Sequence, residues 1–155
     1  SLNSLDPKSA SAFFGRAYVH DQREEYKQAA DDYTKASQLN PNDPETWNNL
    51  CWALGIIDQL KTALYACDRS LSLRPNSAVT SNSRGLVNLK SGNLAQAIED
   101  YDRALNMSPK DENSLYGRGI SKLKLGDRAG GEEDINAAKA ISSTVADDFK
   151  KLGIR

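Results

Sequence analysis

Residues that commonly carry catalysis or bind metals are scarce in this chain. Its 155 residues include one histidine, His20, and two cysteines. A lone histidine has no second imidazole with which to share a metal ion, and a place near an expected turn favours an exposed or half-buried structural role. Cys51 and Cys67 lie sixteen residues apart without a nearby histidine, which is not the spacing of a zinc site. The sequence therefore predicts no catalytic centre and no metal or cofactor site.

The chain also lacks an excess of either charge and a long apolar run. Lysine and arginine number 20 against 21 acidic residues, so the net charge is −1. No field of one sign is present to attract a nucleic acid or an anionic membrane. No apolar run approaches the roughly 18 residues of a membrane span, and no signal-peptide pattern occurs. We expect a soluble protein without nucleic-acid or membrane partners, cytoplasmic by default, or periplasmic or secreted if a signal peptide has been removed.

Phosphate-binding loops rich in glycine are missing as well. The pair Gly130-Gly131 lies early in an expected helix and follows no predicted strand. We therefore interpret these glycines as packing residues rather than as a phosphate site.

Proline is rare, yet its placement reveals a repeat. Four of the five prolines lie 34 residues apart, and equivalent positions can be counted from Ala10, Pro44, Ala78 and Glu112 without an insertion. Positions 8, 20 and 27 carry small residues in every unit. Position 24 carries Tyr33, Cys67, Tyr101 and Ile135. A fixed period of this length indicates a repeat architecture.

The unit at 78–111 shows what one period forms. Leu86 and Leu89 supply apolar residues at helical spacing, Gly92-Asn93 interrupts the pattern, and Ala97 and Tyr101 begin a second stripe. These features predict two helices joined by a tight turn. One such hairpin cannot bury its own apolar face, so we expect it to stack against the neighbouring units.

A helix-turn-helix unit of 34 residues, with small residues at positions 8, 20 and 27, an aromatic at 24 and proline at 32, resembles the tetratricopeptide repeat (TPR) family. The resemblance implies an all-α fold, a right-handed solenoid of four TPR repeats with a C-terminal capping helix. The repeats would be 10–43, 44–77, 78–111 and 112–145, within a single domain 1–155. Ser81 at position 4 and Cys67 at position 24 depart from the family pattern.

The two ends of the chain extend this scheme. Leu5 precedes Pro7 by two residues, as in later units, so residues 1–9 are interpreted as the remnant of a preceding repeat, with a simple helix-start signal as the alternative. At the other end we expect a capping helix over about 145–152. Thr144 could cap it, and Val145, Phe149 and Leu152 would share one face.

Two columns of residues vary together across the expected hairpins. Position 7 carries Arg16, Leu50, Arg84 and Arg118, and position 23 carries Asp32, Ala66, Asp100 and Asp134. Arginine occurs with aspartate three times, and leucine occurs with alanine once. Because positions 7 and 23 are symmetric about the turn, we expect three Arg-Asp pairs, with solvated charges on unrelated faces as the alternative.

Cys51 and Cys67 occupy positions 8 and 24, so they should also face each other across one hairpin. We expect free thiols that fill a tight contact, with a disulfide as the alternative, because bridge geometry is demanding and the redox compartment is not known from the sequence.

The resemblance also implies a partner-binding surface. In the family, positions 5, 6 and 9 of the first helices tend to point into a concave groove. In this chain the implied groove residues are Phe14, Tyr18, Asn48, Asn49, Trp52, Asn82, Ser83, Leu86, Tyr116 and Ile120. Asparagine side chains can bond a peptide backbone, and aromatic side chains can anchor an apolar group. The alternative for position 9 is packing between adjacent first helices.

One family ligand, the C-terminal carboxylate of chaperones, is not expected here. Its binders carry lysines, asparagines and an arginine at set positions, and only Asn49 matches that set. Without cations the carboxylate would lack charge-assisted partners. We predict a non-catalytic module that binds a protein or peptide segment in its groove. The alternative is a scaffold or accessory domain of a larger protein, possibly an enzyme with its catalytic part outside this sequence.

Overall fold

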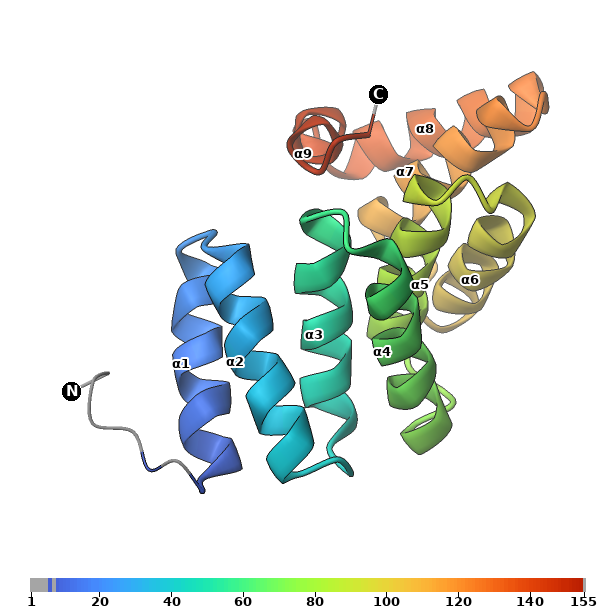
Figure 1. Ribbon diagram of the computed structural model, residues 1–155. Coiled ribbons are helices and arrows are strands. Elements are labelled where there is room, and N and C mark those ends of the chain that lie inside the picture. The colour runs from blue at the N-terminus through green and yellow to red at the C-terminus, as the bar shows by residue number, and fades with distance from the viewer. Residues whose placement is uncertain (1–5, 7, 155) are drawn as a thin grey trace. The chain divides into compact units, whose positions relative to one another are not determined.

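The chain is helical throughout in the computed structural model, which describes residue 6 and residues 8–154 (Figure 1). This described part contains nine helices and no strand, so the predicted all-α fold is confirmed. The interpretation of residues 1–9 depends on Leu5 and Pro7, which lie outside the described residues. The helices are α1 (Ala10–Gln22), α2 (Tyr26–Leu39), α3 (Pro44–Ile56), α4 (Leu60–Leu73), α5 (Ala78–Lys90), α6 (Leu94–Met107), α7 (Glu112–Lys124), α8 (Arg128–Ile141) and α9 (Val145–Lys151).

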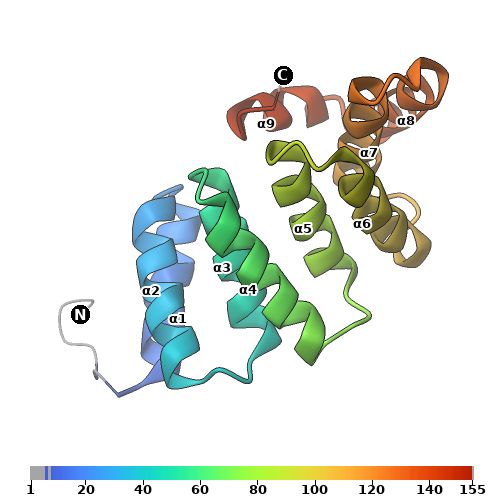
Figure 2. The ribbon, with the colours of Figure 1, turned by 45° about the vertical axis from the view of Figure 1, so that its right-hand side comes forward.

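The helices belong to two compact units, which divide between Pro75 and Asn76. In the first unit, α2 packs against both α1 and α3, and α3 packs against α4 (Figure 1). In the second unit, α6 packs against α5 and α7, while α7 also contacts α5, α8 and α9 (Figure 2). The expectation of a single domain stays a prediction.

The first helix of each pair begins at a side-chain cap. Ser9, Asp43, Ser77 and Asp111 each precede a first helix and accept a hydrogen bond from a backbone N–H in its first turn. Such caps satisfy N–H groups that have no partner within the helix. The capping residues are 34 positions apart, so the repeat period starts each hairpin at the same point.

The turn inside each pair has a common backbone geometry. Its middle residue has a positive φ in every case, namely Glu24, Asp58, Gly92 and Gly126. The residue directly before the second helix donates a backbone hydrogen bond to the first helix, as from Asn93 N–H to the Asn88 carbonyl at 2.8 Å. Glycine adopts this conformation freely, whereas Glu24 and Asp58 adopt it because the hairpin requires it.

Small residues allow the helices of a pair to approach closely. Ala17, Ala29 and Ala97 are fully buried. A Cβ atom added at Gly85 would lie 2.8 Å from the ring of Tyr101, which is too close for a carbon contact. Position 8 is therefore small because the residue at position 24 occupies the space beside it.

Helix α9 closes the second unit, as the sequence predicts. Val145 and Phe149 are buried, and Gly153 ends the helix with a φ of +86°. The expected role of Thr144 is wrong in one respect, because it precedes the helix but caps no backbone N–H with its side chain. Its hydroxyl lies 3.3 Å from the Asp148 carboxylate instead. Ile154, which the sequence analysis did not select, is also buried.

Candidate functional site

The three predicted Arg-Asp pairs are present, each within one hairpin. Arg16 Nε donates to Asp32 at 2.7 Å, and Arg118 Nε donates to Asp134 at 2.8 Å. Arg84 donates to Asp100 through both Nε and Nη2, at 3.0 and 2.8 Å. All three carboxylates are buried. A buried carboxylate requires such donors, so these arginines hold the hairpins together and are not available to a ligand.

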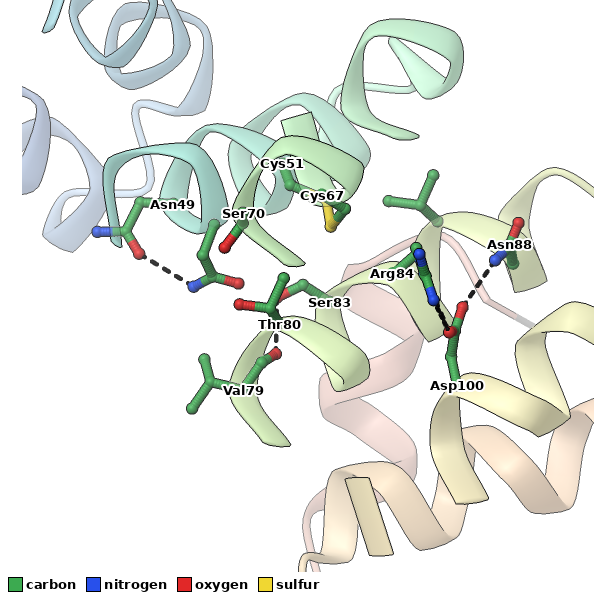
Figure 3. Close-up of a disulfide and its surroundings, with 12 residues drawn as sticks. Asn49, Cys51, Cys67, Ser70, Val79, Thr80, Ser83, Arg84, Asn88 and Asp100 are labelled. Carbon is green, nitrogen blue, oxygen red and sulfur yellow. Dashed lines mark hydrogen bonds and ion pairs between the residues drawn. A yellow bond between two sulfur atoms is a disulfide. The ribbon is translucent and has the colours of Figure 1, made fainter. Parts of the chain in front are cut away.

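The pair of the third hairpin has additional donors. Asn88 Nδ2, on the same helix as Arg84, donates to the second oxygen of Asp100 at 2.8 Å (Figure 3). Arg103 Nη1 donates to Asp100 at 3.0 Å. Asp100 therefore accepts hydrogen bonds from Arg84, Asn88 and Arg103.

The pair of the fourth hairpin shows how such donors change the pKa of a buried aspartate. Burial alone would raise the pKa of Asp134, but hydrogen bonds from Arg118 and Lys122 outweigh burial and lower the pKa below its ordinary value. Asp102 also accepts a hydrogen bond from Arg118, at 2.9 Å. The fourth hairpin is thus clamped by a network and not by a single pair.

The second hairpin replaces the ionic pair with a covalent one. Leu50 and Ala66 occupy the clamp positions and are both buried. One position along, Cys51 and Cys67 form a disulfide with their Cα atoms 5.2 Å apart (Figure 3). The expectation that the cysteines face each other is confirmed. The expectation of free thiols is wrong, because the hairpin brings the two Cα atoms within bridging distance.

In the first unit the two predicted amides are bonded to the protein. Asn49 Nδ2 donates to the hydroxyl of Tyr33 at 3.4 Å, and Asn48 Nδ2 donates to Asn49 Oδ1 at 3.3 Å. Asn48 is buried and Asn49 is half-buried. Asn49 therefore keeps only part of its bonding capacity for a partner.

The predicted aromatic residues of the first unit are more accessible. Tyr18 is 51% exposed on α1, and Trp52 is half-buried on α3. Phe14 is half-buried, with its ring 5.5 Å from that of Tyr33 in an edge-to-face contact. Tyr18 and Trp52 can contact an apolar group with little rearrangement.

In the second unit, the predicted polar residues are bonded internally. Asn82 Oδ1 accepts a hydrogen bond from Ser114 Oγ at 3.2 Å, which links α5 to α7. Ser83 is buried and its hydroxyl donates to the Val79 carbonyl at 3.1 Å. Asn82 is half-buried and retains its amide hydrogens for a partner.

The predicted apolar residues of the second unit differ in exposure. Leu86 is only 2% exposed, which agrees with the packing alternative for position 9, whereas Ile120 is half-buried. Tyr116 is half-buried with its ring 4.7 Å from that of Phe149, so α9 covers part of the predicted surface. Burial raises the pKa of the Tyr116 hydroxyl, and the charge of Asp147 adds to the shift.

The grouping of these residues into a partner-binding groove within each unit stays a prediction. The further prediction, one continuous strip across all four repeats, stays a prediction. Sequence reasoning missed the role of position 24, where Tyr33 contacts Asn49 and Tyr101 lies against Gly117. The signal was present, because 16 residues separate both pairs.

The residues considered for chemistry have structural surroundings. His20 is half-buried near the turn, as expected, with Nε2 3.8 Å from Asp32 Oδ2. A Cβ atom at Gly131 would meet Leu123 at 2.7 Å, which supports the packing interpretation of that glycine. Within residues 6 and 8–154, no group of His, Cys, Asp or Glu is arranged to hold a metal ion. In the same residues no helix is long and apolar enough to cross a membrane.

Comparison with known families agrees with this geometry. A family model described as tetratricopeptide repeat matches residues 10–43, and a second, described as TPR repeat, matches residues 85–126. The chain belongs to the tetratricopeptide repeat family. TPR proteins are generally interaction modules without catalytic activity of their own, so the repeats support a protein-interaction module. No curated protein matches the TPR chain in a sequence search.

Solved structures share the fold at low sequence identity. The MamA protein is 20% identical with a TM-score of 0.78, over 92% of this chain and 78% of MamA. YrrB, described as a TPR protein with an unusual peptide-binding site, is 24% identical with a TM-score of 0.77, over 94% of this chain and 76% of YrrB. The first TPR of Spaghetti (RPAP3), bound to the HSP90 peptide SRMEEVD, is 20% identical with a TM-score of 0.72, over 79% of this chain and 97% of the Spaghetti chain.

Proposed function

We propose that this TPR chain is a non-catalytic module whose first helices bind an extended or helical segment of a partner protein. The observation that carries the proposal is the accessibility of Tyr18 and Trp52, two aromatic side chains on first helices of one unit. Soluble proteins expose such side chains at interfaces, where rigid aromatic groups supply most of the binding energy. Peptide binding by YrrB and by the first TPR of Spaghetti (RPAP3) supports the same use of the fold.

The partner-binding strip would combine aromatic anchors with amides. In the first unit, Tyr18 and Trp52 would hold an apolar side chain and Asn49 would bond the peptide backbone. In the second unit, Asn82 would bond the backbone in the same way. Ser83 and Leu86 are buried, so within the second unit they would contribute packing and not direct contact with a partner. A chaperone C-terminal carboxylate remains outside the proposal, since the strip contains neither lysine nor arginine.

The test is capture of the partner from an extract of the source organism, followed by titration of the purified partner. Trp52→Ala should weaken binding by roughly 2 kcal/mol or more, as expected of an interface anchor. Asn82→Ala should weaken it by about 1 kcal/mol. Leu125→Ala is the control, because Leu125 is exposed in a turn and lies outside the strip. Undiminished affinity in both strip variants, with helical content unchanged, would contradict the proposal.

A further inference from the structure

The first unit contains an apolar hollow that the partner-binding strip does not include. It lies between α2 and α4 with α3 as its floor, and its volume is about 290 Å³. Trp47, Leu50 and Leu54 line the floor, and Tyr65, which is 60% exposed, stands at the rim. This volume accommodates one large side chain and lies at the lower limit, roughly 300 Å³, of small-molecule sites.

The hollow and the strip use different faces of α3. Trp47, Leu50 and Leu54 recur at spacings of three and four and share one side of the helix. Asn49 and Trp52 fall on the opposite side, because each residue advances the direction by about 100°. A ligand of the hollow therefore does not compete for the strip residues of α3.

The hollow is apolar because the second hairpin lacks the ionic clamp. Leu50 and Ala66, which line it, occupy the positions at which Arg118 and Asp134 pair in the fourth hairpin. Leu50 is shorter than the arginine of the other hairpins, and Ala66 has a methyl group where they have the carboxylate of aspartate. The disulfide one position along ties α3 to α4, so the hairpin is held without filling this space.

The threonine and serine hydroxyl groups of the walls donate to nearby backbone carbonyl groups. Thr34 and Ser37 donate to carbonyl groups of α2, at 2.7 Å each, and Thr62 donates to the Gln59 carbonyl at 3.1 Å. These hydroxyls have used their single protons within their own helices. Gln38 and Tyr65 also line the hollow and carry polar groups, but the spent hydroxyl donors and the side chains of Trp47, Leu50 and Leu54 together favour an apolar side chain.

A cation stands beside the hollow. The guanidinium group of Arg69 lies 5.7 Å above the Trp47 ring in a cation–π contact. Among the described residues Arg69 forms no ion pair, unlike the arginines of the three clamps. Its charge is complementary to a carboxylate that approaches from solvent.

We propose that this hollow is a second docking site, which binds a partner protein segment carrying a large apolar side chain close to an aspartate or glutamate. The apolar side chain enters between Trp47 and Leu54 and packs against Tyr65. The carboxylate pairs with Arg69 at the Trp47 end. The strip and the hollow would then hold two different segments of one partner, or two partners.

The probe is a random peptide library displayed on phage, panned against the wild-type chain. The chain itself provides the matched variant, Leu50→Arg with Ala66→Asp, which rebuilds the ion pair of the other hairpins and fills the hollow. Enriched peptides should carry an aromatic or branched apolar residue near an acid. Their affinity should fall about tenfold or more in this variant, and Arg69→Ala should weaken only peptides that contain the acid.

Other outcomes would overturn the proposal. Peptides that bind the double variant as tightly as the wild type, or whose binding is lost only in Trp52→Ala, belong to the strip and not to the hollow. A wild-type dimer in sedimentation velocity that disappears in the double variant would assign the hollow to a second copy of the chain. If the double variant does not fold, Tyr65→Ala replaces it, because Tyr65 is exposed.

Discussion

Cys51 of α3 and Cys67 of α4 form a disulfide at the two positions where the third hairpin packs Gly85 against Tyr101. The adjacent clamp positions hold Leu50 and Ala66 in this hairpin alone. The second hairpin has thus exchanged an ion pair and a small-to-aromatic contact for one covalent bond. Both arrangements join the same two faces, because residues symmetric about the turn always meet.

Removing the disulfide should destabilise the first unit. Cys51→Ala with Cys67→Ala, or reduction of the wild type, should lower the free energy of unfolding by about 3 kcal/mol, the value for a loop of this length. Both tryptophans lie in the first unit, so urea unfolding followed by tryptophan fluorescence reports on it directly. A midpoint that does not respond to reductant in the wild type would contradict this prediction.

The Arg84–Asp100 pair should show strong coupling in a double-mutant cycle. Arg84→Leu alone should be more costly than Arg84→Leu with Asp100→Ala, because the single change leaves a buried acid without its main partner. Arg84→Leu alone should lower the free energy of unfolding by an amount near the lower end of the roughly 3–5 kcal/mol expected for a broken buried pair. The reason is that Asn88 and Arg103 still donate to Asp100.

The matched control for this cycle is the exposed pair Arg128–Glu132, whose atoms are 3.0 Å apart. Its coupling should not exceed about 1 kcal/mol. Urea unfolding followed by circular dichroism measures both cycles. Equal coupling energies for the two pairs would show that burial adds nothing to the clamp.

Tyr33 and Tyr101 occupy the same repeat position, but removing their hydroxyl groups should change the free energy of unfolding differently. Tyr101 is fully buried, and its hydroxyl has no hydrogen-bond partner among the described residues. Tyr33 accepts a hydrogen bond from Asn49. Burial raises the pKa of both hydroxyls, so both are protonated near neutral pH.

Tyr101→Phe should therefore be neutral or stabilising, while Tyr33→Phe should cost about 0.5–1 kcal/mol. Circular dichroism in urea measures the first variant, and tryptophan fluorescence measures the second. A Tyr101→Phe variant less stable than Tyr33→Phe would reveal a bonded water or an unrecognised partner at Tyr101.

The cap helix should stabilise the second unit through one aromatic contact. Phe149 is buried against Tyr116, so Phe149→Ala should lower the free energy of unfolding by about 3 kcal/mol. Lys150→Ala, at the exposed neighbouring position, is the control and should leave it unchanged. Thermal unfolding followed by circular dichroism makes the comparison. Matching curves for the two variants would show that α9 does not close the unit.

The sequence by itself determined the helices, their pairing and the partners across each hairpin. These features are local, because a period of 34 residues and a three-residue turn place positions 7 and 23, and positions 8 and 24, opposite each other. The Arg-Asp pairs and the approach of Cys51 to Cys67 followed from that symmetry. The confirmed all-α fold and the family assignment rest on the same repeat.

Only the tertiary structure decided which predicted groove residues are accessible and where the surface forms a hollow. Tyr18 and Leu86 occupy the same repeat position, yet one is exposed and the other buried, because exposure depends on neighbouring helices and not on register. Phe149 of α9 contacts Tyr116 of α7. The 34-residue period does not specify this contact, because α9 lies beyond the last repeat. The state of the two cysteines and the hollow over Leu50 likewise depend on distances and volumes between packed helices, which residue spacing alone does not contain.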